Sequence, residues 1–219
     1  SLPLSGEGQG GGGVNSPQQE AQSTTSLPLK GEGEGEGGGG VTTPNKKAEV
    51  ASSTQPRAQL LGSGTILREV IAAADLLESE WNVSADVWSV TSFTELRRDG
   101  LAIERTNRFN PDQPEKKTWV EQCLDGTEGP IIASTDYMRA LPDMIRTWVP
   151  RRYVTLGTDG FGRSDTRAAL RRFFEVDRHH VVVATLKALA DEGTIKREVL
   201  KQAIEKYGID GTRENPWDI

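Results

Sequence analysis

Hydrophobic residues follow two different spacings between residues 58 and 219, and the spacing changes several times along the chain. Short runs of mostly apolar residues are typical of buried strands, whereas apolar residues about three or four positions apart are typical of helices. The short runs predict strands over 59–62, 86–91, 130–134 and 153–156.

Helical spacing fills the intervals between these strands and the segment after the last one. Ile66, Val70, Ala73 and Leu77, for example, form one apolar stripe. The predicted helices cover 66–81, 94–108, 119–124, 137–148, 164–174, 177–193 and 194–206. Because strands alternate with helices, we expect an α/β fold whose mainly parallel sheet is covered on both faces.

Side chains that can accept a backbone N–H bond stand where several of these helices should begin. The expected N-caps are Thr94, Ser164 or Asp165, Asp177 and Thr194. Gly193 and Gly208 are expected to end the last two helices, since glycine readily adopts the left-handed conformation found after helix ends. The helix over 137–148 is expected despite Pro142.

The first 57 residues have a different composition. They contain no aromatic residue and 13 of the 24 glycines, and the motif Ser-Leu-Pro-Leu at 1–4 returns at 26–29. A segment with so few apolar residues cannot bury enough surface to offset the entropy lost on ordering. We therefore expect 1–57 to be a disordered Gly/Pro/Ser-rich tail with a 25-residue repeat, and 58–219 to be one folded domain.

Charge and hydropathy exclude some classes of function. The net charge is −6, so a phosphate-backbone partner, and with it nucleic acid, is not expected. No apolar run approaches the roughly 20 residues of a membrane span, and no signal peptide opens the sequence. These features predict a soluble, cytoplasmic protein without a membrane partner. The single Cys123 excludes an internal disulfide.

Several potentially reactive residues have simple structural interpretations. The turn 62–65 (Gly-Ser-Gly-Thr) lacks the third glycine of a dinucleotide motif and is expected to be a tight turn with a Ser/Thr cap. His179 and His180 are adjacent on a helix and point in different directions, so they are not expected to chelate one metal. Cys123 has no basic neighbour in sequence and is expected to pack inertly.

The turn 157–167 is the strongest candidate site, because it is rich in glycine and charge and joins a strand to a helix. Its candidate residues are Asp159, Arg163, Ser164 and Arg167, and Asp136 and Arg139 after the preceding strand could share the same edge. Three interpretations remain open. The residues could cap a helix and form an internal Asp–Arg ion pair, form a subunit or domain interface, or bind a small anion or line a substrate channel.

This turn and three other blocks resemble one protein family. The blocks are 61–69 (LGSGTILRE), 88–100 (WSVTSFTELRRDG), 156–167 (LGTDGFGRSDTR) and 174–178 (FEVDR). Together, across about residues 58–210, they resemble the C-terminal, transketolase-like domain of the homodimeric pyruvate dehydrogenase decarboxylase component (acetyl-transferring). The resemblance implies a three-layer α/β sandwich with a mixed, mainly parallel sheet of four or five strands.

The resemblance also implies a functional context. The complete enzyme of this family decarboxylates pyruvate with thiamine diphosphate and magnesium, and then acetylates the lipoyl group of the acyltransferase component. Its cofactor lies between the first two domains, across the dimer interface, while the C-terminal domain mainly supports assembly.

The sequence does not contain the family's diphosphate motif. Residues 157–160 (Gly-Thr-Asp-Gly) are not the Gly-Asp-Gly motif, and no asparagine occurs between Asn110 and Asn215. We therefore expect no catalytic, cofactor-binding or metal residue in this chain. The predicted function is that of a C-terminal domain fragment that is inactive alone and that pairs as a homodimer or with the missing decarboxylase domains. The alternative is a non-enzymatic dimerisation or anion-binding module.

Overall fold

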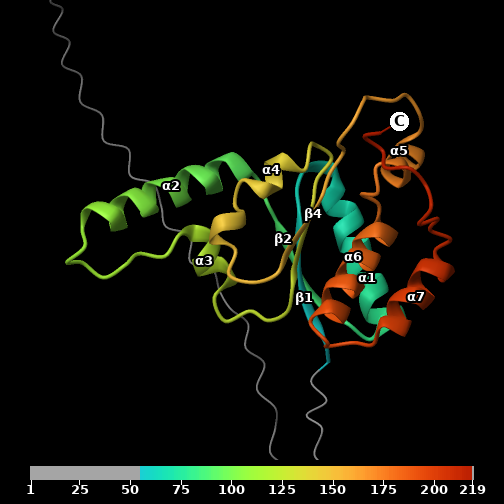
Figure 1. The fold of residues 1–219 in the computed structure, drawn as a ribbon, viewed down its shortest axis with the longest axis horizontal. Coiled ribbons are helices and arrows are strands. Elements are labelled where there is room, and N and C mark those ends of the chain that lie inside the picture. Colours follow the sequence, from blue (N-terminus) through green and yellow to red (C-terminus); the bar gives the residue numbers. More distant parts are fainter. Residues whose placement is uncertain (1–54, 219) are drawn as a thin grey trace, which may run out of the picture. The chain divides into compact units, whose positions relative to one another are not determined.

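The computed structural model describes residues 55–218, in which four parallel strands form one sheet (Figure 1). The strands lie in the order β2-β1-β3-β4. They are β1 (Arg57–Gly62), β2 (Ser84–Ser89), β3 (Ile131–Ser134) and β4 (Tyr153–Leu156). The four strands predicted from apolar runs are confirmed, although β2 lies two residues earlier than expected. The predicted tail lies, apart from its last three residues, outside the described residues.

The sheet is more regular than the resemblance implied. All three strand pairs, β1 with β2, β1 with β3 and β3 with β4, are parallel. The expected mainly parallel α/β sheet of four strands is confirmed, but the antiparallel strand of a mixed sheet is not found within residues 55–218.

Helices α1 (Leu67–Trp81), α6 (Arg178–Asp191) and α7 (Arg197–Lys206) lie on one side of the sheet (Figure 1). Their apolar stripes pack on alternate sheet residues such as Leu60 and Ile132. In α6 almost every turn contributes a buried residue, since this helix is sandwiched between α1, α7 and the sheet. Burial of this continuous apolar surface is the main force that holds this layer in place.

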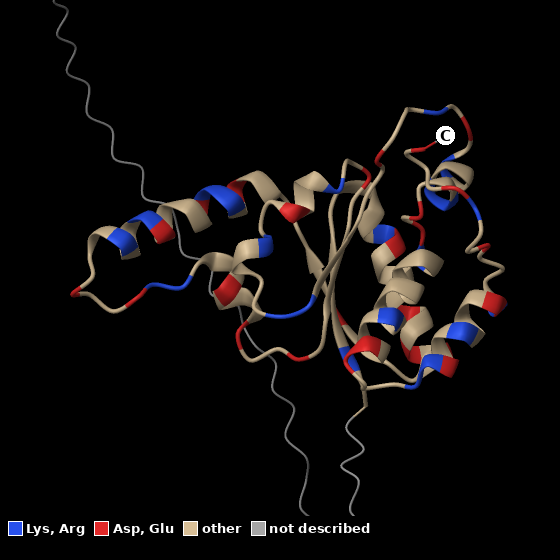
Figure 2. Cartoon of the chain, viewed as in Figure 1, with Lys and Arg blue, Asp and Glu red and all other residues tan. Residues whose placement is uncertain are grey.

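The other face is covered by α2 (Phe93–Phe109), α3 (Trp119–Leu124), α4 (Ala140–Asp143) and the 3-10 helix Arg146–Trp148. A second apolar core lies here and includes Leu61, Ile131 and Ile145. Two covered faces make the three-layer arrangement that was expected. Figure 2 shows that most Lys, Arg, Asp and Glu residues lie on helices and loops. Of the four strands, β1 and β2 contain one charged residue each, Arg57 and Asp86, whereas β3 and β4 contain none, as expected for strands covered by helices.

Three predicted helix starts are wrong by a few residues. Helix α2 is capped by Ser92, whose Oγ accepts from the amide of Glu95, and not by Thr94. Helix α5 (Arg167–Phe173) is capped by Thr166, whose Oγ1 accepts from the amide of Ala169. Helix α7 begins after Lys196 without a side-chain cap instead of at Thr194. In each case the predicted residue is of a type that often caps helices, but the backbone becomes helical at a different position.

The long helix predicted over 137–148 is also wrong. Only α4 and the 3-10 helix form there, separated by Met144 and Ile145. In a continuous helix from residue 137, the ring of Pro142 would clash with the carbonyl of Met138, whereas a proline in the first turn of a helix that starts at Ala140 is tolerated. The structure therefore begins α4 late enough to accommodate this proline.

Candidate functional site

The carboxyl ends of the parallel strands meet at one edge of the sheet, where hydrogen bonds connect the loops after β1, β3 and β4. Ser63 Oγ donates to Thr135 Oγ1 at 2.9 Å, and Thr65 Oγ1 donates to Asp136 Oδ2 at 2.9 Å. Ser63 and Thr65 therefore bind the neighbouring loop and do not cap the following helix, which corrects the expected Ser/Thr cap. Gly64 has a φ of +56°, in the left-handed region that favours glycine.

Three hydrogen bonds connect the turn after β4 to the loop after β3. The amide of Thr158 donates to the carbonyl of Tyr137 at 2.9 Å, and its hydroxyl donates to the carbonyl of Asp136 at 3.1 Å. Asp159 Oδ1 accepts from the amide of Arg139 at 2.9 Å. The structure thus brings the candidate residues Asp136, Arg139 and Asp159 to the same edge, and Asp159 holds the backbone that precedes α4.

The remaining candidates lie further along the turn. The guanidinium of Arg163 lies 4.3 Å from the ring centroid of Phe173, in a cation–π contact. Ser164 is exposed and lies before the helix, because Thr166 is the cap. Arg167 is the first residue of α5. Within residues 55–218 no ion pair joins Asp159 to Arg163 or Arg167, so the expected internal Asp–Arg pair is not formed.

An open groove of about 430 Å³ lies between these loops and α5. Its polar lining includes Asp136, Thr158, Arg163, Arg167 and Arg171. Its apolar lining comes from Ile66, Phe161, Leu170, Phe174 and Val176. The groove therefore combines three guanidinium groups and one carboxylate with an apolar wall.

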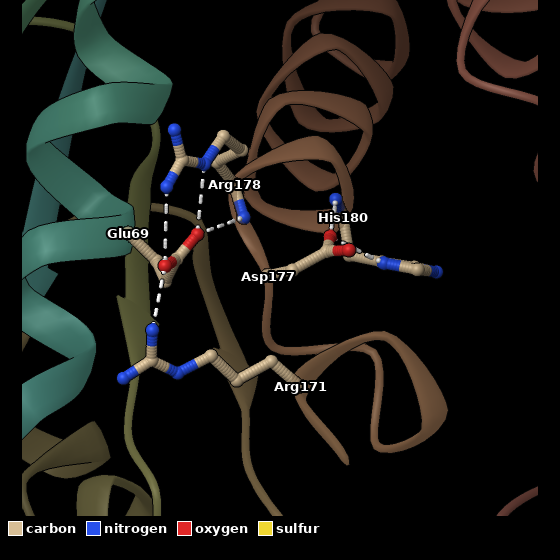
Figure 3. Close-up of polar contacts among 5 residues, drawn as sticks. All are labelled: Glu69, Arg171, Asp177, Arg178 and His180. Carbon is tan, nitrogen blue, oxygen red and sulfur yellow. Dashed lines mark hydrogen bonds and ion pairs between the residues drawn. The ribbon is translucent and has the colours of Figure 1, made fainter. Parts of the chain in front are cut away.

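One wall of this groove is fixed by a buried carboxylate that the sequence analysis missed. Glu69 of α1 is 6% exposed and accepts from Arg171 Nη1 at 2.7 Å and from Arg178 Nε at 2.9 Å (Figure 3). Burial alone would raise the pKa of Glu69, but hydrogen bonds from Arg178 and the charges of Arg178 and Arg171 outweigh it and lower the pKa. Glu69 lies four residues before Ala73 on the buried stripe of α1, and a charge on an apolar stripe was the available signal.

Asp177 and the two histidines have structural contacts. Asp177 caps α6 by accepting from the amide of His180 at 3.0 Å, and its carboxylate also contacts His180 Nδ1 at 2.7 Å (Figure 3). The cap at Asp177 is confirmed. The ring of His179 stacks on Tyr207 with centroids 4.4 Å apart. The two histidines therefore contact different partners.

Cys123 lies on α3, beside a second hollow of about 240 Å³ on the opposite face of the sheet. The hollow is mainly apolar, and its lining includes Trp88, Val90, Leu96 and Trp119. Burial raises the pKa of the Cys123 thiol. The thiol is therefore less reactive than a free cysteine, because the thiolate is the nucleophilic form.

The described residues do not fit a site for magnesium diphosphate. Within residues 55–218 no group of three or more His, Cys, Asp or Glu side chains could hold a metal ion. Asp159, the acid of the glycine turn, has one carboxylate oxygen engaged by the amide of Arg139. No step of a thiamine diphosphate reaction can therefore be derived from these side chains. Along residues 55–218, no helix combines the length and apolar character needed to cross a membrane.

Comparison with known protein families assigns this chain to one of them. The model of the transketolase-like TK C-terminal domain matches residues 46–177. The chain therefore belongs to the transketolase-like C-terminal domain family.

Curated relatives narrow the similarity. The chain is 62% identical over 161 residues to the pyruvate dehydrogenase E1 component of Pseudomonas aeruginosa. This alignment covers 73% of this chain and 18% of that protein. It is 56% identical over 170 residues to the same component of Cupriavidus necator, covering 78% of this chain and 19% of the relative. For Escherichia coli K12 the identity is 47% over 169 residues, covering 77% of this chain and 19% of the relative. The resemblance inferred from the sequence, to the C-terminal domain of this component, is confirmed.

The chain spans less than a fifth of the length of these relatives. Among solved structures, a split gene transketolase described as an inactive β4 tetramer aligns with a TM-score of 0.43 and 17% identity. That alignment covers 62% of this chain and 40% of the transketolase chain.

Proposed function

We propose that this chain acts as the C-terminal domain of a pyruvate dehydrogenase E1 component and contributes to assembly of the enzyme, while other domains carry the chemistry. The complete enzyme would decarboxylate pyruvate in the cytoplasm and acetylate the lipoyl group of its acyltransferase partner. Thiamine diphosphate and magnesium would be bound by the decarboxylase domains, so the chain alone would be inactive. The observation that carries this proposal is the 62% identity to a pyruvate dehydrogenase E1 component over 161 residues.

The surface at the carboxyl edge supports a role in assembly. Four large apolar side chains are exposed on the loops after β3 and β4 and at the C-terminal segment. They are Tyr137 (57%), Met138 (46%), Phe161 (80%) and Trp217 (45%). These segments lie together, because Thr158 binds Tyr137 and the backbone of Pro216 and Trp217 lies against Gly160. Exposed apolar side chains gathered in this way are typical of protein interfaces.

Complementation with a truncated relative tests the proposal. The Pseudomonas aeruginosa E1 component would be prepared without the segment that matches this chain, and the full 219-residue chain would be added back. We expect association and recovery of pyruvate decarboxylation on mixing, and neither decarboxylation nor tight thiamine diphosphate binding by the chain alone. Activity of the chain alone, or no association with the truncated enzyme, would contradict the proposal.

A matched pair of variants locates the surface. Met138→Glu places a charge within the exposed apolar surface, and Ile71→Glu places the same charge on α1, where the side chain is 47% exposed against 46% for Met138. We expect only Met138→Glu to weaken association with the truncated enzyme, since it must desolvate a charge at the interface. Equal behaviour of the two variants would exclude this surface.

The same exposed residues also favour a second candidate function, self-association without an enzymatic role. Sedimentation of the chain alone distinguishes the two functions. A dimer that Met138→Glu dissociates, together with no binding to the truncated enzyme, would favour the second candidate.

A further inference from the structure

The groove at the carboxyl edge presents one face of α5. Arg167, Leu170 and Arg171 of α5 and its C-cap residue Phe174 all line it, and their spacing of three or four positions places them on the same side. The rest of the lining comes from the turn after β4, including Phe161 and Arg163, and from the 3-10 helix Gly64–Ile66 that precedes α1. Its volume of about 430 Å³ falls within the range of pockets that hold small molecules.

The charge of the lining differs in sign from that of the whole protein. The lining contains three basic residues, Arg163, Arg167 and Arg171, and one acid, Asp136, in a chain of net charge −6. Because Glu69 pairs with Arg171, one excess positive charge remains at the groove. Asp136 already accepts a hydrogen bond from Thr65. A local excess of positive charge beside an apolar wall attracts anions and excludes cations.

The three arginines differ in how they are occupied. Arg171 is held by the buried carboxylate of Glu69, and Arg163 rests on the ring of Phe173. Arg167, in contrast, makes no side-chain hydrogen bond or ion pair with any of residues 55–218. As far as residues 55–218 are concerned, its guanidinium therefore has its full set of donors available to a ligand, and a planar fork of donors matches phosphate and carboxylate.

The apolar wall determines what else the ligand must carry. Ile66 and Val176 also line the groove and are fully or almost fully buried, with 0% and 1% exposure. Leu170 and Phe174 are half-buried and offer apolar surface to the groove. A bare inorganic anion would leave this surface uncovered, whereas an organic anion would cover it.

We propose that this groove binds a small organic oxyanion, with its phosphate or carboxylate head on Arg163 and Arg167 and its apolar body against Leu170 and Phe174. Arg171 also lines the site, but its charge is paired with that of Glu69. This inference goes beyond the proposed role in assembly and does not depend on it.

Titration of the full chain tests the inference with four probes: phenyl phosphate, benzoate, inorganic phosphate and phenol. Calorimetry gives the affinities, and the backbone amide NMR signals of Gly160, Gly162 and Arg167 report the site. We expect phenyl phosphate or benzoate to bind more tightly than both inorganic phosphate and phenol, and to shift these three signals. The tighter of the two aromatic anions identifies the head group. No saturable binding of either anion, or phenol binding as tightly as both, would overturn the proposal.

Variants assign the binding to the arginines. Arg167→Gln should weaken binding of the preferred anion about tenfold or more, since it removes a charge-assisted hydrogen bond. Arg97→Gln, at an exposed arginine of α2 on the other face of the sheet, is the matched control and should leave the affinity unchanged. The dispersion of the NMR spectrum confirms that both variants fold. Equal weakening by both variants, or no weakening by Arg167→Gln, would overturn the assignment.

Discussion

The carboxylate of Glu69 in α1 accepts a hydrogen bond from Arg178 Nε at 2.9 Å, across a sequence separation of 109 residues. The same carboxylate accepts from Arg171 Nη1 at 2.7 Å, and its side chain is only 7% exposed. One acid therefore joins the first helix of the domain to α5 and to the start of α6. It also fixes the wall of the groove that carries Arg167.

Glu69→Gln should destabilise the domain. The substitution keeps the size of the side chain but removes the charge that neutralises two arginines, of which Arg171 is 21% and Arg178 45% exposed at the side chain. Because both arginines retain some contact with water, we expect a loss of about 1–3 kcal/mol in the free energy of unfolding. Urea unfolding measures it. Glu78→Gln, at an exposed acid of the same helix, is the control, and equal midpoints for both variants would contradict the prediction.

The contribution of Glu69 should also depend on pH. Burial would raise its pKa, but hydrogen bonds from Arg178 and the charges of Arg178 and Arg171 bring it below the ordinary value of 4.5. A group with a lowered folded pKa stabilises the protein fully above its unfolded pKa and loses that contribution as the pH falls through the folded pKa. The difference in unfolding free energy between the wild type and Glu69→Gln should therefore shrink on acidification. A constant difference down to acid pH would show that the carboxylate charge does not act.

Gly100→Ala should destabilise the layer formed by α2. A Cβ at Gly100 would lie 2.5 Å from Trp148 Cε2, and the indole is held by a hydrogen bond to Glu104 at 2.9 Å. Alanine favours a helix by about 1 kcal/mol over glycine, but overpacking against a fixed ring outweighs this gain and leaves a net loss of about 1–3 kcal/mol. Thermal unfolding measures the loss. Gly211→Ala, where no atom lies within 4 Å of the added Cβ, should be nearly neutral.

The start of α5 can be tested with two neighbouring hydroxyls. Thr166→Ala removes the acceptor of the Ala169 amide and should lower the free energy of unfolding by about 1 kcal/mol. Ser164→Ala, at the cap expected from sequence, should have almost no effect because Ser164 is exposed and lies before the helix. Chemical denaturation of both variants decides between them. A larger loss for Ser164→Ala would mean that α5 begins earlier than the structure places it.

Substitutions of Asp177, the cap of α6, test whether its charge or its capping oxygen stabilises the helix. Asp177→Ala removes both the acceptor for the His180 amide and the partner of the His180 ring, so we expect a loss of about 1–2 kcal/mol. Asp177→Asn keeps a good capping side chain and should retain most of the stability. Circular dichroism melts of the two variants measure the difference. If Asn and Ala destabilise equally, the charge and not the capping oxygen is the stabilising feature.

Local sequence signals predicted some elements well and others poorly. Helix α3 was predicted with its observed bounds, and its Thr118 and Glu121 form a reciprocal capping box. Asp177 was also a correct cap, because its carboxylate reaches an amide three residues away. The helix expected over 137–148 failed because it placed Pro142 in a helix interior, whereas a proline is tolerated only in the first turn. The amide of Arg139, just before α4, donates to Asp159, and the local sequence pattern contains no sign of that partner 20 residues later.

The position of the candidate site could be predicted from the sequence, but the contacts of its side chains could not. Its position after β4 could be predicted because glycine, charge and a strand end are local features, and the resemblance to the family rests on the same residues. The roles of individual side chains could not be predicted in this way. Arg163 was expected near an acid, yet its guanidinium lies on Phe173, and Thr166 caps the helix that Ser164 or Asp165 was expected to cap.

The amino-acid sequence by itself determined the class of fold and the location of the charged turn, because periodic burial and local hydrogen bonding act over a few residues. The family followed separately, from the resemblance of four sequence blocks. The tertiary structure alone decided the order of the strands, the joining of Glu69 to Arg171 and Arg178, and the groove that places Arg167 beside Leu170 and Phe174. These features depend on contacts between segments distant in sequence. Such contacts form only when the whole apolar core has assembled and fixed the distances between the elements.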